Sequence, residues 1–202
     1  MALLESLLLG FGIGLSGALA PGPTLLATIS GAGRHGPFVG GRVAIGHLLV
    51  ESVLVVALFV GLAPLVIAHQ AAIALLGGVA LVGFGLLTLG GARSASLSSP
   101  GGGTGAGPVF AGALTTVANP YFWIWWATLG GALLVPALAS GPGDAALYLA
   151  GHGAADLGWL LFVGIGISRG ASLLTDRGYR ALLAACGVAM VGIGLAYATY
   201  AL

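Results

Sequence analysis

Long apolar runs, separated by short polar or proline-containing breaks, dominate the pattern along this chain. A helix that crosses the hydrocarbon core of a bilayer needs about 20 apolar residues. Six stretches reach this length and predict membrane-spanning helices: residues 4–33, 38–67, 71–92, 109–138, 144–169 and 179–201. The first and the fourth are too long for a simple span, and both contain proline. The pattern therefore predicts an all-α polytopic membrane protein with broken first and fourth spans.

The composition is typical of a membrane protein and indicates that the lipid bilayer, not a nucleic acid, is its partner. The mean hydropathy is +1.11, only 5% of the 202 residues are charged, and 38 are glycine. Such a chain needs the lipid bilayer as its solvent, and frequent glycine is typical of closely packed membrane helices. The single cysteine, Cys186, excludes an internal disulfide. We expect no nucleic-acid partner, because the chain has no basic cluster.

The arginines predict the orientation. The chain has no lysine, and its six arginines flank the loops after the first, third and fifth spans: Arg34, Arg42, Arg93, Arg169, Arg177 and Arg180. Loops rich in positive charge remain in the cytoplasm. Both termini are therefore predicted to lie outside, with these three loops inside.

Recurring features divide the chain into two predicted repeats. Residues 1–92 form the first set of three helices, and residues 109–202 form the second. Residues 93–108 are a Gly/Ser/Pro-rich stretch that predicts a flexible cytoplasmic linker. A glycine-rich stretch at 78–86 recurs at 187–195. An odd number of helices in each repeat inverts the second copy, as in many secondary transporters.

The most distinctive pattern is Gly-His-x-x-x-acid, which occurs once in each predicted repeat. Residues 46–51 contain His47 and Glu51, and residues 151–156 contain His152 and Asp156. A spacing of four places each histidine and its acid on one helix face. Counted from the two opposite membrane faces, both acids lie about 16–18 Å deep in their helices. We therefore expect the two pairs to meet near the midplane, where ionisable groups are costly and usually functional.

Proline breaks are expected beside these pairs. The first span contains Pro21, Gly22, Pro23 and Thr24, and the fourth contains Asn119 and Pro120. Proline should free backbone carbonyls at Gly17, Leu19 and Thr116 for a cation. Half-helices starting at Thr24 or Tyr121 would direct their positive ends at a substrate carboxylate. Trp123, in the aromatic run 121–126, is expected to line the same site.

The residues Leu19-Ala20-Pro21-Gly22-Pro23-Thr24, followed in the second half by Asn119-Pro120, resemble the signature of the lysine exporter (LysE/RhtB) family of small six-helix transporters. The His-x-x-x-acid pairs resemble a prokaryotic subgroup. The resemblance implies efflux of amino acids or related amino compounds across the prokaryotic cytoplasmic (inner) membrane, driven by the proton gradient. No cofactor is expected.

Other functions remain open at this point. Two histidines, one glutamate and one aspartate also suit a divalent metal cation, so a metal transporter that uses His47, Glu51, His152 and Asp156 is the alternative. An enzyme is not expected, because the chain has neither a zinc-protease pattern nor a nucleophile elbow. Glycine pairs at 83/85 and 192/194 suggest a homodimer or packing within the chain.

Overall fold

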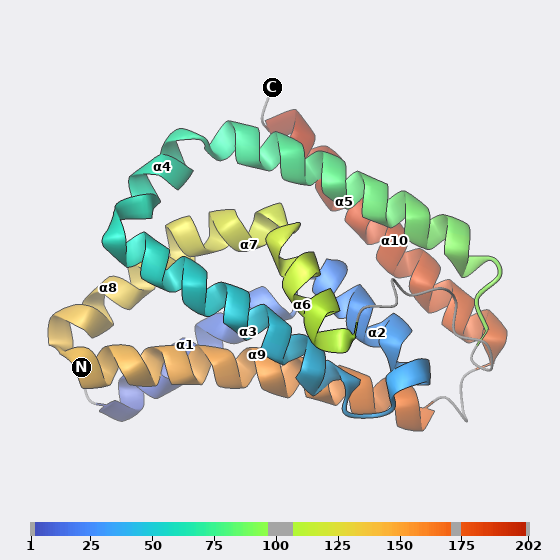
Figure 1. Ribbon diagram of the computed structural model, residues 1–202, viewed down its shortest axis with the longest axis horizontal. Helices are drawn as coiled ribbons and strands as arrows, with labels where there is room; N and C mark the ends of the chain where they lie inside the picture. Colours follow the sequence, from blue (N-terminus) through green and yellow to red (C-terminus); the bar gives the residue numbers. More distant parts are fainter. Residues whose placement is uncertain (1–2, 97–106, 171–174, 201–202) are drawn as a thin grey trace.

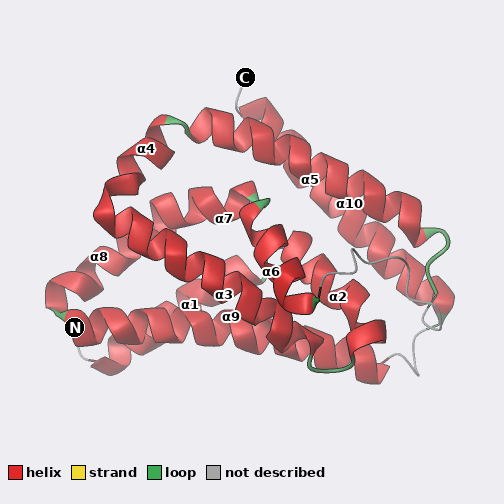
Figure 2. Ribbon diagram, viewed as in Figure 1, coloured by secondary structure: helices red, strands yellow, loops and turns green. Residues whose placement is uncertain are grey.

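The computed structural model describes residues 3–96, 107–170 and 175–200, and all regular elements in these ranges are helices (Figures 1 and 2). The α-helices are α1 Leu3–Ala18, α2 Pro23–His35, α3 Val39–Ala57, α4 Ala63–Ala68, α5 Gln70–Ala92, α6 Pro108–Val117, α7 Pro120–Trp125, α8 Gly131–Ser140, α9 Pro142–Gly170 and α10 Asp176–Tyr200. Two π-helical turns, η1 Leu58–Leu62 and η2 Trp126–Gly130, join α3 to α4 and α7 to α8.

The helices confirm an all-α polytopic membrane protein. Within the described ranges five helices are long and apolar enough to cross a membrane: Val39–Leu62, Ala71–Ala92, Pro120–Ser140, Pro142–Gly170 and Asp176–Thr199. The pair α1 and α2, bent by 77° at its break, makes a sixth if it is counted as one span. Helix α6 is a shorter apolar helix that precedes the Pro120–Ser140 span. The broken regions are therefore the two that the prolines predicted.

The carbonyls at these breaks are not free as expected. The Ala20 N–H donates to the Gly17 carbonyl at 3.1 Å, and the Asn119 N–H donates to the Thr116 carbonyl at 3.1 Å. The expectation of freed carbonyls at Gly17 and Thr116 was wrong, because each helix ends in a tight i to i+3 turn that occupies them. The Val117 carbonyl accepts the Trp123 indole N–H at 2.9 Å.

The second span bends at a glycine. Gly61 lies inside η1 with a φ of 106°, a left-handed conformation that favours glycine. The chain therefore turns away from α3 into α4 before it enters α5. Figure 1 shows α4 at the corner between α3 and α5.

Three helix pairs form the body of the protein: α1 packs on α9, α3 packs on α6, and α5 packs on α10 (Figure 1). In each of the first two pairs, one glycine of each helix lies against the backbone of the other helix. A Cβ on Gly10 would strike the backbone of Tyr148, and one on Gly151 would strike that of Leu7. These reciprocal contacts bring the two backbones together.

The second pair repeats this arrangement. A Cβ on Gly112 would strike the Val43 backbone, and one on Gly46 would strike that of Val109. The glycine of each Gly-His-x-x-x-acid pattern is therefore a helix-contact residue. The packing is what two inverted repeats would produce, although the division at residues 93–108 stays a prediction. Residues 97–106 of that predicted linker lie outside the described residues.

Of the glycines considered for dimerisation, one of each pair packs inside the chain and the other lies on its surface. Gly85 of α5 approaches the Gly187 carbonyl of α10, and Gly194 approaches that of Gly78, so these glycines pack within the chain. Gly83 and Gly192 are exposed, and no described atom lies within 4 Å of a Cβ built on either.

Candidate functional site

The two His/acid pairs form one buried cluster between α3 and α9. The His47 Nε2 atom lies 3.0 Å from Glu51 Oε2 and 3.5 Å from Asp156 Oδ2. The His152 Nε2 atom lies 3.4 Å from Glu51 Oε2 and 3.2 Å from Asp156 Oδ2. Glu51, His152 and Asp156 are 5%, 3% and 5% exposed. Each histidine thus contacts the acid of its own helix and that of the other helix.

Helix packing produces this meeting. Within α3, His47 and Glu51 are one turn apart, and the same holds for His152 and Asp156 within α9. The packing of α3 against α9 brings the two faces together.

Thr116 of α6 orients His47. The Thr116 hydroxyl lies 2.9 Å from His47 Nδ1 and donates to the Gly112 carbonyl at 2.7 Å. Because its only proton is used there, the hydroxyl accepts from His47, so Nδ1 carries hydrogen. In the neutral imidazole the Nε2 atom then presents its lone pair to the two acids.

The other histidine has no equivalent hydroxyl. Thr116 lies four residues after Gly112, and the corresponding position after Gly10 is Gly14, which faces the His152 backbone. His152 Nδ1 is buried and has no hydrogen-bond partner among the described residues. Two indoles hold this ring instead: the centroids of Trp125 and Trp126 lie 5.1 and 4.9 Å from that of His152. The two half-sites therefore differ in what orients the histidine.

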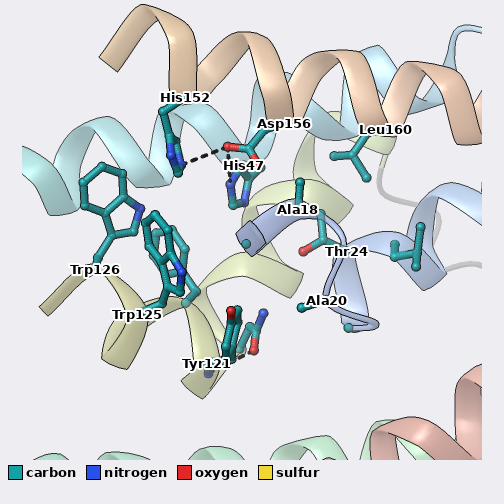
Figure 3. Close-up of a pocket in the computed structure, with 15 residues that line it drawn as sticks. Ala18, Ala20, Thr24, His47, Tyr121, Trp125, Trp126, His152, Asp156 and Leu160 are labelled. Carbon is teal, nitrogen blue, oxygen red and sulfur yellow. Dashed lines mark hydrogen bonds and ion pairs between the residues drawn. The ribbon is translucent and has the colours of Figure 1, made fainter. Parts of the chain in front are cut away.

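A cavity of about 70 Å³ lies beside the cluster (Figure 3). Its lining includes several residues expected at the site: Gly22, Thr24, His47, Asn119, His152 and Asp156. Figure 3 shows Trp125 and Trp126 on the side of His152, and Thr24 and Ala20 at the break between α1 and α2. The volume accommodates a few water molecules or one compact ligand.

Other expected site residues lie outside this lining. Four of them, Pro21, Pro23, Glu51 and Pro120, do not line the central cavity, although Glu51 contacts both histidines that do. Pro120 contributes with Trp123 to a separate, more apolar cavity against α4 and α5. Trp123 caps the end of α6 through its indole. Asn119 caps the start of α7, since its side chain accepts the Tyr121 N–H at 3.1 Å.

Four residues beside the cluster were not predicted as site residues: Thr116, Phe122, Trp125 and Trp126. Phe122 packs edge-on against His47, with ring centroids 5.5 Å apart. The aromatic run itself was a visible signal, but which of its members face the cavity depends on the direction in which α7 leaves the break. Thr116 carried no signal of its own beyond its place near the break.

The arrangement can bind positive charge at one part of the cavity and negative charge at another. Ligand atoms of His47, Glu51 and Asp156 all lie within 4.8 Å of one another, as the donors of a metal site do. On the same cavity, α2 begins at Pro23 without a side-chain cap, and the buried Trp125 indole N–H has no partner among the described residues. These N–H groups suit an anion.

Comparison with known proteins identifies the family. The family model described as LysE type translocator matches residues 15–201, which include both His/acid pairs and both proline breaks. No curated protein matches the chain, and no solved structure matches it. A match over nearly the whole length, to a family of translocators that fits the observed helices, shows that the chain belongs to the LysE type translocator family.

Proposed function

We propose that this protein is a secondary active transporter that exports small amino compounds, driven by the proton gradient. The observation that carries the proposal is the central cavity, which is bordered by an uncapped helix N-terminus and by the buried carboxylate of Asp156, while Glu51 lies behind the two histidines that line it. A zwitterion needs this combination. Membership of a family of translocators supports transport of amino acids or related compounds.

The substrate carboxylate binds at the start of α2. Thr24 and Leu25, the residues that follow Pro23, line the cavity, and N–H groups in a first helical turn have no intrahelical partner. The Trp125 indole N–H is buried on the same cavity and supplies a further donor. Fixed donors in a water-poor cavity bind a carboxylate more strongly than donors in water.

The substrate ammonium group binds near Glu51 and Asp156. Burying two carboxylates in a membrane protein is costly unless positive charge accompanies them. The ammonium group supplies that charge while the substrate is bound, and protons supply it when the substrate has left. Alternation between the two couples substrate movement to proton movement, while the halves of the protein expose the cavity to one side and then to the other.

The proposal extends to the setting of the protein. It lies in the prokaryotic inner membrane with both termini outside, as the arginines predict. It works as a homodimer that meets through the exposed glycines Gly83 and Gly192, which no other part of the described chain covers. The mass of the purified protein in detergent, measured by light scattering, tests the dimer.

Reconstitution in liposomes tests the function. The purified protein is reconstituted into the membrane of vesicles that are loaded with radiolabelled amino acids or their decarboxylated amines. These vesicles should release amino acids when a proton gradient is applied. Trp125→Phe should weaken binding of the amino acid more than binding of the matching amine, because it removes a donor to the carboxylate. Glu51→Gln and Asp156→Asn should abolish both flux and the accompanying proton movement.

Glu5→Gln is the matched control, since it makes the same chemical change at an exposed position outside the cavity. It should leave flux unchanged. Wild-type flux and proton movement in both Glu51→Gln and Asp156→Asn would refute the coupling mechanism. A panel in which no amino compound moves would refute the substrate class.

A further inference from the structure

The four ligand atoms of the His/acid cluster lie at the spacing of ligands around a metal ion. The alternating Nε2 and carboxylate oxygen atoms of His47, Glu51, His152 and Asp156 are 3.0–3.5 Å from their neighbours. A first-row divalent ion with bond lengths near 2.0–2.2 Å holds adjacent ligands about 2.8–3.6 Å apart, from square to tetrahedral geometry. His47, Glu51 and Asp156 thus have the spacing of three ligands of one ion, since their ligand atoms all lie within 4.8 Å of one another, and His152 adjoins both acids as a fourth.

These close approaches have the distances of ion pairs, which they form only when the histidines are protonated. Glu51 Oε2 and Asp156 Oδ2 are buried, yet neither atom has a hydrogen-bond partner among the described residues. Buried carboxylate oxygens without partners are rare and costly. The nitrogen and oxygen atoms are close without being aligned with one another, as expected when they surround a third atom.

The charge of the cluster favours a divalent ion. With neutral imidazoles, Glu51 and Asp156 give the site a charge of two negative units, which protonation of His47 and His152 would balance when no metal is bound. The cavity lining contains no lysine or arginine that could neutralise it. Other titratable groups in this region are Tyr121 in the cavity lining and Tyr148 on α9, neither of which supplies a positive charge. One divalent cation balances the charge without leaving a surplus.

Thr116 supplies His47 with the hydrogen-bond acceptor that a metal-binding histidine usually has on its second ring nitrogen. A ligating histidine almost always donates its second ring N–H to a nearby acceptor, which fixes the tautomer and directs the other nitrogen at the metal. Thr116 accepts from His47 Nδ1 and is itself held by the Gly112 carbonyl. Packing against Trp125 and Trp126 orients His152.

We propose that His47, Glu51, His152 and Asp156 bind one divalent first-row transition-metal cation. Imidazole and carboxylate donors without thiolate suit ions from manganese to zinc and exclude a preference for soft ions. Calcium and magnesium prefer sites made wholly of oxygen ligands, so the two imidazoles select against them. The site goes beyond the proposed amino-compound transport and does not depend on it, because the cation needs only the cluster. The cation would use the same carboxylates as the substrate ammonium group and the protons, so it would compete with them.

Calorimetry and cobalt spectroscopy on the purified full chain test this site. The protein is prepared in detergent without a polyhistidine tag and freed of metal by chelation. Titration with Mn²⁺, Co²⁺ and Ni²⁺ should show one saturable site per chain, with affinity rising in that order. Mg²⁺ and Ca²⁺ should show no saturable binding. Bound Co²⁺ should give visible absorption bands that report nitrogen and oxygen ligands.

Variants of Thr116 test whether the cluster binds a metal ion or only holds the helices together. Thr116→Val keeps the shape of the side chain but removes the acceptor, and should weaken Co²⁺ binding about 10–100-fold. Thr116→Ser should restore it. His69→Ala is the matched histidine control, because His69 is exposed and lies away from the cluster. Glu51→Gln, checked for folding by gel filtration, should abolish binding.

Absence of saturable Co²⁺ and Ni²⁺ binding would overturn the proposal, as would binding that Glu51→Gln leaves intact or that His69→Ala removes. Equal affinities in Thr116→Val and the wild type would overturn the assignment of Thr116. The same preparations are assayed for amino-acid flux with and without chelator. Flux without metal binding refutes the metal site alone, and metal binding without flux refutes the proposed amino-compound transport alone.

Discussion

The contact between α3 and α6 gives the sharpest prediction about the packing that holds the site together. Gly46 precedes His47, and a Cβ at this position would overlap the backbone of Val109 and Ala113. The obstacle is main chain, so no side-chain rotation can relieve it. Gly46→Ala must therefore move α3 and α6 apart or distort one of them.

The expected cost combines two terms. Alanine is favoured over glycine inside a helix by about 1 kcal/mol. Overpacking a close contact costs about 1–3 kcal/mol, and a clash with backbone belongs at the upper end. Gly46→Ala should therefore lose a net of about 2 kcal/mol. For a chain of this size that corresponds to a fall in melting temperature of roughly 4–8 °C.

Thermal unfolding in detergent, followed by tryptophan fluorescence, measures this change. Gly166→Ala on α9 is the matched control, since Gly166 is exposed and no other described helix lies within 4 Å of the added methyl group. The control should be as stable as the wild type or slightly more so. Gly151→Ala, at the corresponding contact between α9 and α1, should lose as much as Gly46→Ala. If Gly46→Ala and Gly166→Ala melted at the same temperature, the close approach of α3 and α6 would be refuted.

Three further predictions follow from other described contacts. Ser6→Ala should destabilise the protein by about 1–3 kcal/mol, because Asp144 loses the buried hydroxyl that donates to it at 2.6 Å; the same unfolding assay measures the loss. Asn119→Ala should cost about 1 kcal/mol by removing the cap of α7, whereas Asn119→Asp should retain the cap. In a cysteine-free background, the proposed orientation predicts that Ser140→Cys is labelled by a membrane-impermeant maleimide from outside and that Ser94→Cys is labelled only after lysis.

Each of these three predictions has a control variant or an outcome that would contradict it. Ser16→Ala removes an exposed hydroxyl that bonds only within its own helix, and should have little effect on unfolding. A loss as large as that of Ser6→Ala would contradict the role given to the buried pair. Equal stability of Asn119→Ala and Asn119→Asp would contradict the cap. External labelling of Ser94→Cys would reverse the orientation.

Much of the fold could be read from the sequence because its causes are local. Apolar runs of sufficient length must span a membrane, since only a helix satisfies its own backbone there. The breaks at Pro23 and Pro120 follow from the missing N–H of proline. The spacing of four in each Gly-His-x-x-x-acid pattern places histidine and acid on one face before any tertiary contact is known.

The tertiary structure alone decided how the site is completed. Trp123 was the predicted member of the aromatic run, but the path of α7 after the break turns Trp125 and Trp126 toward His152. The Trp123 indole instead caps α6. Thr116 became a partner of His47 only because α6 packs on α3.

The expectations for the Gly17 and Thr116 carbonyls were wrong for a related reason. A missing proline N–H leaves a carbonyl without its usual donor, but whether another N–H reaches it depends on how tightly the chain turns. Residue spacing thus determined which side chains share a helix face, and the approach of distant helices determined which faces meet. That approach depends on glycines whose role is visible only when the opposing backbone is present.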